Sequence, residues 1–423
     1  MTQCKQCVGL AVVMLSASCG IAAHSSALRN GFSGERLARI DSLLDSFVND
    51  GRVGGVVALV LRDGKPVYER AVGWRDKEAR SPMAMDTVFR IASQSKALTS
   101  VAILELMEEG KLTLNDSAGK WIHTFAHTTV GATRDNGTGL TVVPAKRPIT
   151  IRDLLTHTAG IDYGTSPEVS ALYEAKGFGP GAGFGWYLAD KREPICELME
   201  RLGTLPFVAQ PGEAYVYGYS TDVLGCIVEK ASGVPLDEFI RAHITAPLGM
   251  KDTYFFLPSD KRERLAAVYG SDKDGKAVRQ GDGPTGQGSY VDGPRASFSG
   301  GAGLVSTARD YATFLEALRN GGALGKARIL SPHAVALMTT NQIADNLKTP
   351  RGLGFGYGFE THDVYGVSGM ESVGSWGWAG AYGTYYRVDP KERLVAVLMY
   401  QMIPNNTDLT DKFKATLYQA LLD

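Results

Sequence analysis

Two segments of the chain carry a serine followed three residues later by a lysine, Ser93–Lys96 and Ser117–Lys120. In a helix this spacing places both side chains on one face, one turn apart. Such a pair joins a nucleophilic hydroxyl to an amine that can take its proton, which is the pairing that covalent catalysis uses. The amine must be neutral for this role, and burial favours the neutral form of a lysine.

The surroundings of the two pairs differ. Ser93 opens an apolar stretch with no charge other than Lys96 before Glu105, which predicts a buried central helix. A serine at a helix start also meets free backbone N–H groups and the positive end of the helix dipole. Ser117 follows Asn-Asp in a polar turn, where capping of a short helix is expected. We therefore expect Ser93 to be the nucleophile, with capping as the alternative, and Ser117 to be a bystander.

Other catalytic and metal-binding chemistries have weaker support. The chain contains no Gly-x-Ser-x-Gly segment, and the nearest match, Gly218–Asp222, lacks the last glycine. His157 ends a predicted helix and is expected to be a structural hydrogen-bonding residue. His123 and His127 have the spacing of a metal-binding pair but no third ligand close in sequence. We expect neither a metal ion nor a cofactor.

Composition limits the partners. The 423 residues include 44 basic and 45 acidic side chains, so the chain lacks the positive charge that nucleic-acid binding requires. Apolar residues are dispersed, which excludes a protein with several membrane spans. Of five cysteines, only Cys196 and Cys226 lie beyond the first twenty residues, which excludes a disulfide scaffold. No obligate protein partner is evident, and the sequence leaves the oligomeric state open.

Residues 1–25 resemble an export signal. Lys5 precedes the apolar run Val8–Ala23, and small residues stand near its end. This pattern indicates transport to the periplasm or the exterior of a bacterial cell. The protein is expected in the cytoplasm if the segment is not processed, and a disordered or docked N-terminus is the alternative.

Both ends of the chain have a β-hairpin beside an amphipathic helix. A helix is expected over Glu35–Gly51, followed by strands Val53–Leu61 and Pro66–Gly73 around an Asp-Gly turn. Strands Tyr382–Val388 and Leu394–Gln401 precede a C-terminal helix. An isolated hairpin is only marginally stable, so the two hairpins are expected to share one antiparallel sheet flanked by helices.

The middle of the chain has a different pattern. We predict an α/β lobe from residues 33–115 and 295–423 and an inserted, mostly helical lobe with glycine-rich loops over 116–294. Its expected helices are Ile151–His157, Pro194–Leu202, Thr221–Ala231 and Leu236–Ala246. The fold class is therefore α+β, with a ligand cleft expected where the lobes meet.

Four ordered segments carry a resemblance to a known family: Thr87–Lys96, Leu154–Gly160, Gly301–Ala308 and Gly380–Thr384. Together they resemble the serine β-lactamase and penicillin-binding-protein fold. The most similar branch is the family VIII carboxylesterases, which are similar to class C β-lactamases. The resemblance spans nearly the whole chain, from about residue 35 to about residue 420.

The resemblance implies roles for further residues. Tyr217 would face the nucleophile and share proton transfer with Lys96, with Tyr219 as the alternative. Tyr215 is expected to pack in the core. The backbone N–H groups of Ser93 and Ala381 would form the oxyanion hole.

Two departures from the β-lactamase pattern bear on substrate. Class C enzymes carry Tyr-x-Asn where this chain has Tyr217-Gly218-Tyr219, and Lys-Thr-Gly where it has Trp378-Ala379-Gly380. The cation that meets a β-lactam carboxylate is therefore absent from the motif, although a loop arginine could supply one. The esterase branch has tryptophan at this place. Tyr219, Trp378, Ala379 and Gly380 are expected to contact substrate.

These features favour a serine carboxylesterase that acts on small, uncharged acyl esters of about C2 to C6. Weak cephalosporin hydrolysis is expected as a side activity. The alternatives are a β-lactamase or D-Ala-D-Ala peptidase with the same machinery, and a catalytically silent ligand-binding scaffold. Further apolar surface at the cleft mouth is expected from the loop aromatic residues Phe178, Phe184, Trp186 and Tyr187.

Overall fold

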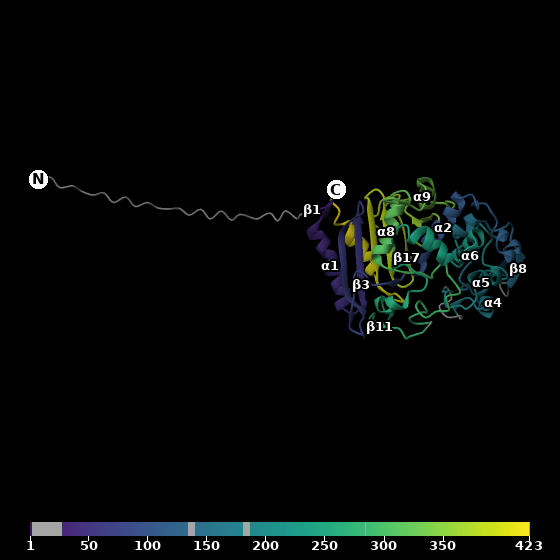
Figure 1. Cartoon of the computed structure of the whole chain (residues 1–423), viewed down its shortest axis with the longest axis horizontal. Helices are drawn as coiled ribbons and strands as arrows, with labels where there is room; N and C mark the ends of the chain where they lie inside the picture. Colours follow the sequence, from purple (N-terminus) through teal and green to yellow (C-terminus); the bar gives the residue numbers. More distant parts are fainter. Residues whose placement is uncertain (2–27, 134–139, 181–186, 284, 423) are drawn as a thin grey trace.

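The computed structural model describes Met1 and residues 28–422, apart from 134–139, 181–186 and 284 (Figure 1). Its largest element is an eight-stranded antiparallel sheet with the strand order β15-β16-β17-β18-β19-β3-β4-β5. The strands are β3 (Gly55–Arg62), β4 (Lys65–Asp76), β5 (Ser81–Pro82), β15 (Gly354–Phe355), β16 (Glu360–Thr361), β17 (Trp376–Gly380), β18 (Thr384–Asp389) and β19 (Leu394–Met399).

The two predicted hairpins are confirmed, and they lie side by side in this sheet. Strands β3 and β4 join through Asp63 and Gly64, which both have positive φ, as a tight hairpin turn requires. Strand β19 pairs with β18 on one side and with β3 on the other. The pairing of β19 with β3 therefore unites the two ends of the chain in one sheet.

Alternate residues of β3 enter two different cores. Val56, Ala58 and Val60 pack with helices α1 (Gly34–Asn49) and α10 (Leu409–Tyr418). Val57 and Leu59 point to the opposite face, into the core that contains α2 (Ser95–Glu108) and α8 (Ala308–Arg319). Figure 1 shows α1 on one side of the sheet and α8 and α2 on the other. This arrangement confirms the α+β class.

Helix α2 is the central helix that the apolar stretch predicts. Every residue from Ser95 to Leu106 is buried, and α6 (Ser220–Ser232) packs against it. The helix begins two residues later than expected, because Ser93 lies in a preceding 3₁₀ turn, η1 (Ala92–Gln94).

The middle of the chain holds the four expected helices, with one further helix, α4, and a small sheet that sequence analysis did not anticipate. The helices are α3 (Ile151–Leu155), α4 (Ser170–Ala175), α5 (Ile195–Leu202), α6 and α7 (Leu236–Ile240), the last continued by a π-helical turn at Arg241–Thr245. Strands β7 (Thr129–Thr133), β8 (Leu140–Pro144) and β9 (Pro206–Phe207) form the sheet. The boundaries proposed for the two lobes stay predictions.

Shorter elements complete the described part. They are β1 (Leu28–Arg29), β2 (Phe32–Ser33), β6 (Phe89–Arg90), β10 (Tyr269–Ser271), β11 (Ala277–Arg279), β12 (Val305–Ser306), β13 (Ala323–Leu324), β14 (Ala327–Arg328) and α9 (Pro332–Thr339), with 3₁₀ turns at Ala118–Lys120, His123–His127 and Ser259–Arg264. None of the described helices is long and apolar enough to cross a bilayer. The signal-like residues 1–25 lie outside the described part, except for Met1.

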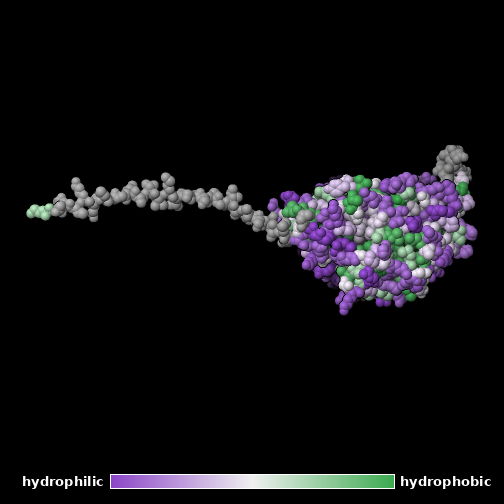
Figure 2. All heavy atoms as spheres, turned by 90° about the horizontal axis from the view of Figure 1, so that it is seen from above, coloured by the Kyte–Doolittle hydropathy of each residue, from purple (hydrophilic) through white to green (hydrophobic). Residues whose placement is uncertain are grey.

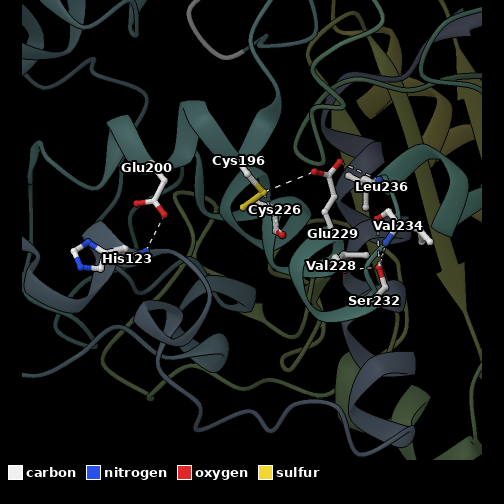
Figure 3. The surroundings of a disulfide bond; sticks show 9 residues. All are labelled: His123, Cys196, Glu200, Cys226, Val228, Glu229, Ser232, Val234 and Leu236. Atoms are coloured by element: carbon white, nitrogen blue, oxygen red, sulfur yellow. Dashed lines mark hydrogen bonds between the residues drawn. A yellow bond between two sulfur atoms is a disulfide. The ribbon is translucent and has the colours of Figure 1, made fainter.

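One disulfide joins two helices of the middle region. Cys196 at the start of α5 is bonded to Cys226 in α6, thirty residues further along the chain (Figure 3). Sequence analysis did not anticipate this bond. It fixes α5 against α6, and α6 in turn packs on the central helix α2.

Candidate active site

A strand, a turn and a helix place Ser93 at the edge of the buried core. Strand β6 pairs with β12, and the amide of Ile91 donates to the carbonyl of Leu304 at 3.1 Å. The next residue, Ala92, has φ +41°, a left-handed conformation that non-glycine residues rarely adopt. This turn redirects the chain into α2 and leaves Ser93 half-buried, within reach of solvent.

Lys96 lies one turn further and is buried, with 1% of its surface exposed. Its Nζ donates to three oxygens: Ser93 Oγ at 3.3 Å, Tyr163 Oη at 3.1 Å and the carbonyl of Gly301 at 2.8 Å. The Ser93–Lys96 spacing therefore produces the expected proximity. These three contacts hold the amine in one position.

A buried carboxyl group supports the Gly301 carbonyl. Asp222 Oδ1 accepts hydrogen bonds from Ser299 Oγ at 2.6 Å and from the amide of Gly301 at 3.2 Å. Burial raises the pKa of Asp222, against the lowering effect of the Ser299 hydrogen bond and of the Lys96 charge. Asp222 thus fixes the backbone segment that receives the lysine.

Tyr163 is the residue of this cluster that sequence analysis missed. It comes from the loop after α3, 67 residues from Lys96, and only its position just after the Leu154–Gly160 motif hinted at a role. Burial is the largest cause that raises the pKa of Tyr163 well above its ordinary value. Its hydroxyl therefore stays protonated and serves Lys96 as a hydrogen-bond acceptor.

Tyr217 faces the same lysine through its ring, whose centroid lies 4.7 Å from Lys96 Nζ. Its hydroxyl accepts a hydrogen bond from Trp378 Nε1 at 3.2 Å. The ring also packs 4.6 Å from the ring of His157. The structure thus brings Tyr217, Trp378 and Lys96 together, but the hydroxyl that hydrogen-bonds the lysine belongs to Tyr163.

His157 lies under Tyr217 as a neutral group. Burial, and then the charge of Lys96, lower its pKa well below the ordinary value. Its carbonyl accepts from the amide of Val216 at 2.7 Å, which ties the loop after α3 to the Tyr217 segment. The backbone of His157 therefore makes the structural hydrogen bond, while its ring serves as packing surface. Tyr215, which sequence analysis placed in the core, is half-buried and its ring contacts that of Phe355.

Strand β17 approaches the Ser93 turn closely. A Cβ on Gly380 would lie 2.4 Å from the carbonyl oxygen of Ile91, so only glycine permits this approach. The next residue, Ala381, is exposed, whereas Trp378 and Ala379 are half-buried. The Trp378-Ala379-Gly380 segment thus lies beside the turn that carries Ser93.

Several aromatic residues lie elsewhere than expected. Tyr219 is fully buried, and its hydroxyl accepts from the amide of Gly179, so its side chain packs beneath the site and does not line it. Phe178 is buried against Tyr219, and Tyr187 is buried against Tyr290, so neither adds apolar surface at the mouth. Phe184 and Trp186 lie outside the described residues.

Arg351 comes from the loop before β15 and lies behind Trp378, 5.5 Å from its ring centroid. Its guanidinium pairs with the buried Glu360, with Nη2 3.0 Å from Oε1 and Nε 3.1 Å from Oε2. A loop arginine therefore packs against the tryptophan and pairs with a carboxylate that also lies 3.9 Å from Arg387 Nη2.

The other candidates of the sequence are not part of this cluster. Ser117 caps a 3₁₀ turn by accepting from the amide of Gly119, and Lys120 pairs with Asp116 at the surface. His123 and His127 begin and end another 3₁₀ turn. In the part of the chain that the structure describes, no group of three or more His, Cys, Asp or Glu side chains could hold a metal ion.

Comparison with known proteins gives consistent results. The Beta-lactamase family model matches residues 40–421. Protein Rv1367c of Mycobacterium tuberculosis is 34% identical, over 84% of this chain and 87% of the relative. Esterase EstB of Burkholderia gladioli is 32% identical, over 86% of this chain and 89% of EstB.

A solved structure shows the same fold. EstCE1, described as a hydrolase with promiscuous acyltransferase activity, superposes with a TM-score of 0.76 at 27% identity, over 92% of this chain and 99% of EstCE1. The family match spans nearly the whole described part, and two of these similar proteins are named as esterases or hydrolases. The chain therefore belongs to the beta-lactamase family.

Proposed function

We propose that this serine ester hydrolase cleaves short-chain acyl esters through an acyl-enzyme on Ser93. One observation carries the proposal: the half-exposed hydroxyl of Ser93 lies 3.3 Å from the buried amine of Lys96 at the start of a central helix. The similarity to EstB and EstCE1 supports the ester as the substrate class.

The reaction begins with proton transfer from Ser93 Oγ to Lys96 Nζ in its neutral form. The oxygen attacks the ester carbonyl, and the backbone N–H groups of Ser93 and Ala381 donate hydrogen bonds to the oxyanion of the tetrahedral intermediate. Collapse of the intermediate breaks the bond to the alcohol. The alcohol takes up the proton that Lys96 received from Ser93. Water then attacks the acyl-enzyme by the same steps and releases the acid.

The two tyrosines have different proposed tasks. Tyr217, with its hydroxyl directed to Trp378, belongs to the proton-transfer set and delivers the proton to the leaving alcohol. Tyr163, protonated and hydrogen-bonded to Lys96, is a positioning residue that holds the amine against Ser93.

Trp378, Ala379 and Gly380 supply the proposed substrate wall. An aromatic ring stands where β-lactamases have a lysine, and Arg351 over this ring is paired with Glu360. A substrate carboxylate thus loses a charge-assisted hydrogen bond of about 1.5–3 kcal/mol. We expect small uncharged esters, of about C2 to C6, to be preferred over long-chain lipids, with weak cephalosporin hydrolysis.

The test compares kcat/KM for acetyl, butanoyl, hexanoyl and dodecanoyl esters with that for nitrocefin on one preparation. The best short ester should exceed nitrocefin, and the dodecanoyl ester should be poor. Nitrocefin turnover equal to the best ester would establish the β-lactamase alternative. An absence of turnover and of any burst with all substrates would establish the silent scaffold.

We also propose that the protein is exported. The disulfide between Cys196 and Cys226 supports this, because such bonds persist in oxidising compartments. Fractionation of the native host should recover the activity outside the cytoplasm, from a chain that starts after the signal-like segment. Recovery of the full-length chain in the cytoplasm would contradict the proposal.

A further inference from the structure

A hollow with a volume of about 690 Å³, whose lining does not include Ser93, lies beside α7 and the π-helical turn that follows it. Its apolar floor is formed by six side chains: Ile240, Met250, Phe255, Phe256, Phe298 and Leu304. Phe298 packs edge-on against Phe255 and Phe256, with centroid distances of 5.5 and 6.1 Å. Aromatic side chains in mutual contact make a preformed apolar pocket, of the size that small-molecule sites have. One face of the molecule likewise carries a contiguous apolar area among hydrophilic residues (Figure 2).

Cations dominate the charged side chains that line this hollow. Arg241, Lys251 and Arg295 contribute three positive charges, against one carboxyl group, Asp237. Burial raises the pKa of Asp237, which weakens its opposition to an anion. The side chain of Lys251 makes no hydrogen bond or ion pair with another described residue, whereas the charge of Arg241 interacts with the carboxyl group of Asp237.

Arg295 shows how such a ligand would meet the wall. Its guanidinium lies 5.5 Å from the ring centroid of Phe256, so a cation and an apolar surface adjoin. An alkyl chain on the aromatic floor would leave its polar end beside these cations. A neutral apolar ligand would use only the floor, and a small inorganic anion only the rim.

We propose that this hollow is a second binding site, for a free alkyl carboxylate. The chemistry of the occupant follows from an apolar floor beside an edge that carries three cations and one carboxyl group. The site is separate from the ester-cleaving centre, so the proposal goes beyond the function given above and does not depend on it.

The hollow shares a wall with the active site. Phe298 and Leu304 line it and bracket the backbone that holds Lys96, since the Gly301 carbonyl accepts from Lys96 Nζ at 2.8 Å. The amide of Leu304 also donates to Ser95 Oγ at 3.0 Å, next to the nucleophile. A ligand that displaces Phe298 or Leu304 would also shift the Gly301 carbonyl that holds Lys96. This backbone segment therefore couples the two sites physically.

The binding experiment uses the full-length Ser93→Ala protein and calorimetric titration with sodium octanoate, with octan-1-ol as the neutral probe. Octanoate should bind saturably at one site, and octanol more weakly. The Arg241→Glu/Lys251→Glu variant should bind octanoate about tenfold more weakly, because two rim cations are reversed. Lys326→Glu/Lys391→Glu, with the same change of net charge on exposed residues outside the hollow, should bind like the parent.

Three results would overturn the proposal: no saturable binding, equal affinity in the two double variants, or equal affinity for octanoate and octanol.

A kinetic measurement on the otherwise unaltered enzyme locates the ligand. Octanoate should change kcat for a short ester, whereas purely competitive inhibition would place it at Ser93 and contradict a second site. Because the titration needs no turnover, failure of the esterase proposal would leave the binding result readable.

Discussion

A serine followed three residues later by a lysine occurs twice in this chain, and the two segments form different structures. At Ser93 the lysine is buried and its amine is 3.3 Å from the serine hydroxyl. At Ser117 the serine caps a 3₁₀ turn, and 55% of the Lys120 side chain is exposed, beside Asp116. The difference lies in the surroundings, because an apolar helix removes the lysine from water and a polar turn gives it a carboxylate. A Ser-x-x-Lys segment thus acquires chemistry only from what buries it.

The largest expected effect separates the two serines. Ser93→Ala should lower kcat by about 10⁴-fold or more, because it removes the nucleophile. Ser117→Ala should leave kcat unchanged and lower the free energy of unfolding by about 1 kcal/mol through loss of a cap. Mass spectrometry after a serine-directed phosphonate should find the adduct on the Ser93 peptide. An adduct on Ser117 or Ser220 would refute the assignment.

The two lysines should separate in the same way. Lys96→Met should remove most activity, by about 10³-fold, since no other amine adjoins Ser93 Oγ in the described part of the chain. Lys120→Met should have kcat/KM within about twofold of the parent, because a surface ion pair contributes little. Steady-state kinetics on folded variants, checked by circular dichroism, measures both. Comparable losses in the two variants would remove the distinction drawn between the segments.

The tyrosines should show a smaller and graded difference. Tyr217→Phe should lower kcat by about 10²-fold or more, and the double variant with Lys96→Met should be little worse than Lys96→Met alone. Tyr163→Phe removes only an acceptor from the lysine, so we expect about a tenfold loss of kcat together with a shifted pH profile. If Tyr163→Phe is the more damaging change and Tyr217→Phe is active, the two roles are reversed.

The smallest expected effect concerns stability and follows from the burial that distinguishes α2. Glu105, on the same helix as Lys96, has a pKa raised from 4.5 to about 8, first by burial and then by Glu109 and Glu108. The folded protein therefore keeps a proton on Glu105 that the unfolded chain releases. The contribution of Glu105 to the free energy of unfolding is complete below pH 4.5 and is lost as the pH rises towards 8.

The test of this effect is urea unfolding at pH 6 and pH 9. Glu105→Gln should abolish a loss on the order of 2 kcal/mol over this range. His243 Nδ1 lies 3.7 Å from Glu105 Oε2, so His243→Asn is the matched control for titration of the facing group. An unchanged pH slope in Glu105→Gln, with the slope lost in His243→Asn, would assign the effect to the histidine.

Local patterns were sufficient for the elements and for the Ser93–Lys96 pair. Hairpin turns, apolar periodicity and a three-residue spacing act within one element, so they can be recognised in a single sequence. Tyr163 and the Gly301 carbonyl reach Lys96 from 67 and 205 residues away, and no local pattern encodes such contacts. The same holds for the Cys196–Cys226 bond and for the parallel pairing of β7 with the two-residue strand β9.

Tyr219 shows the limit of reasoning by motif alone. Its place two residues after Tyr217 suggested contact with substrate. Its side chain is instead buried, and its hydroxyl accepts a hydrogen bond from the amide of Gly179. A motif position fixes where the backbone runs. The direction of a side chain depends on the packing around it, here on Tyr163 and Phe178.

Ala92, with its left-handed backbone just before Ser93, has a consequence for directed evolution of this enzyme. Glycine at this position would relieve strain in the folded chain by about 1 kcal/mol and would add a similar amount of freedom to the unfolded chain. The two effects nearly cancel, so a selection for heat resistance would pass over this position. The same glycine would let the turn sample other conformations and displace the nucleophile, so a selection for turnover would reject it. Selection would therefore act on the methyl group of Ala92 only through its effect on kcat.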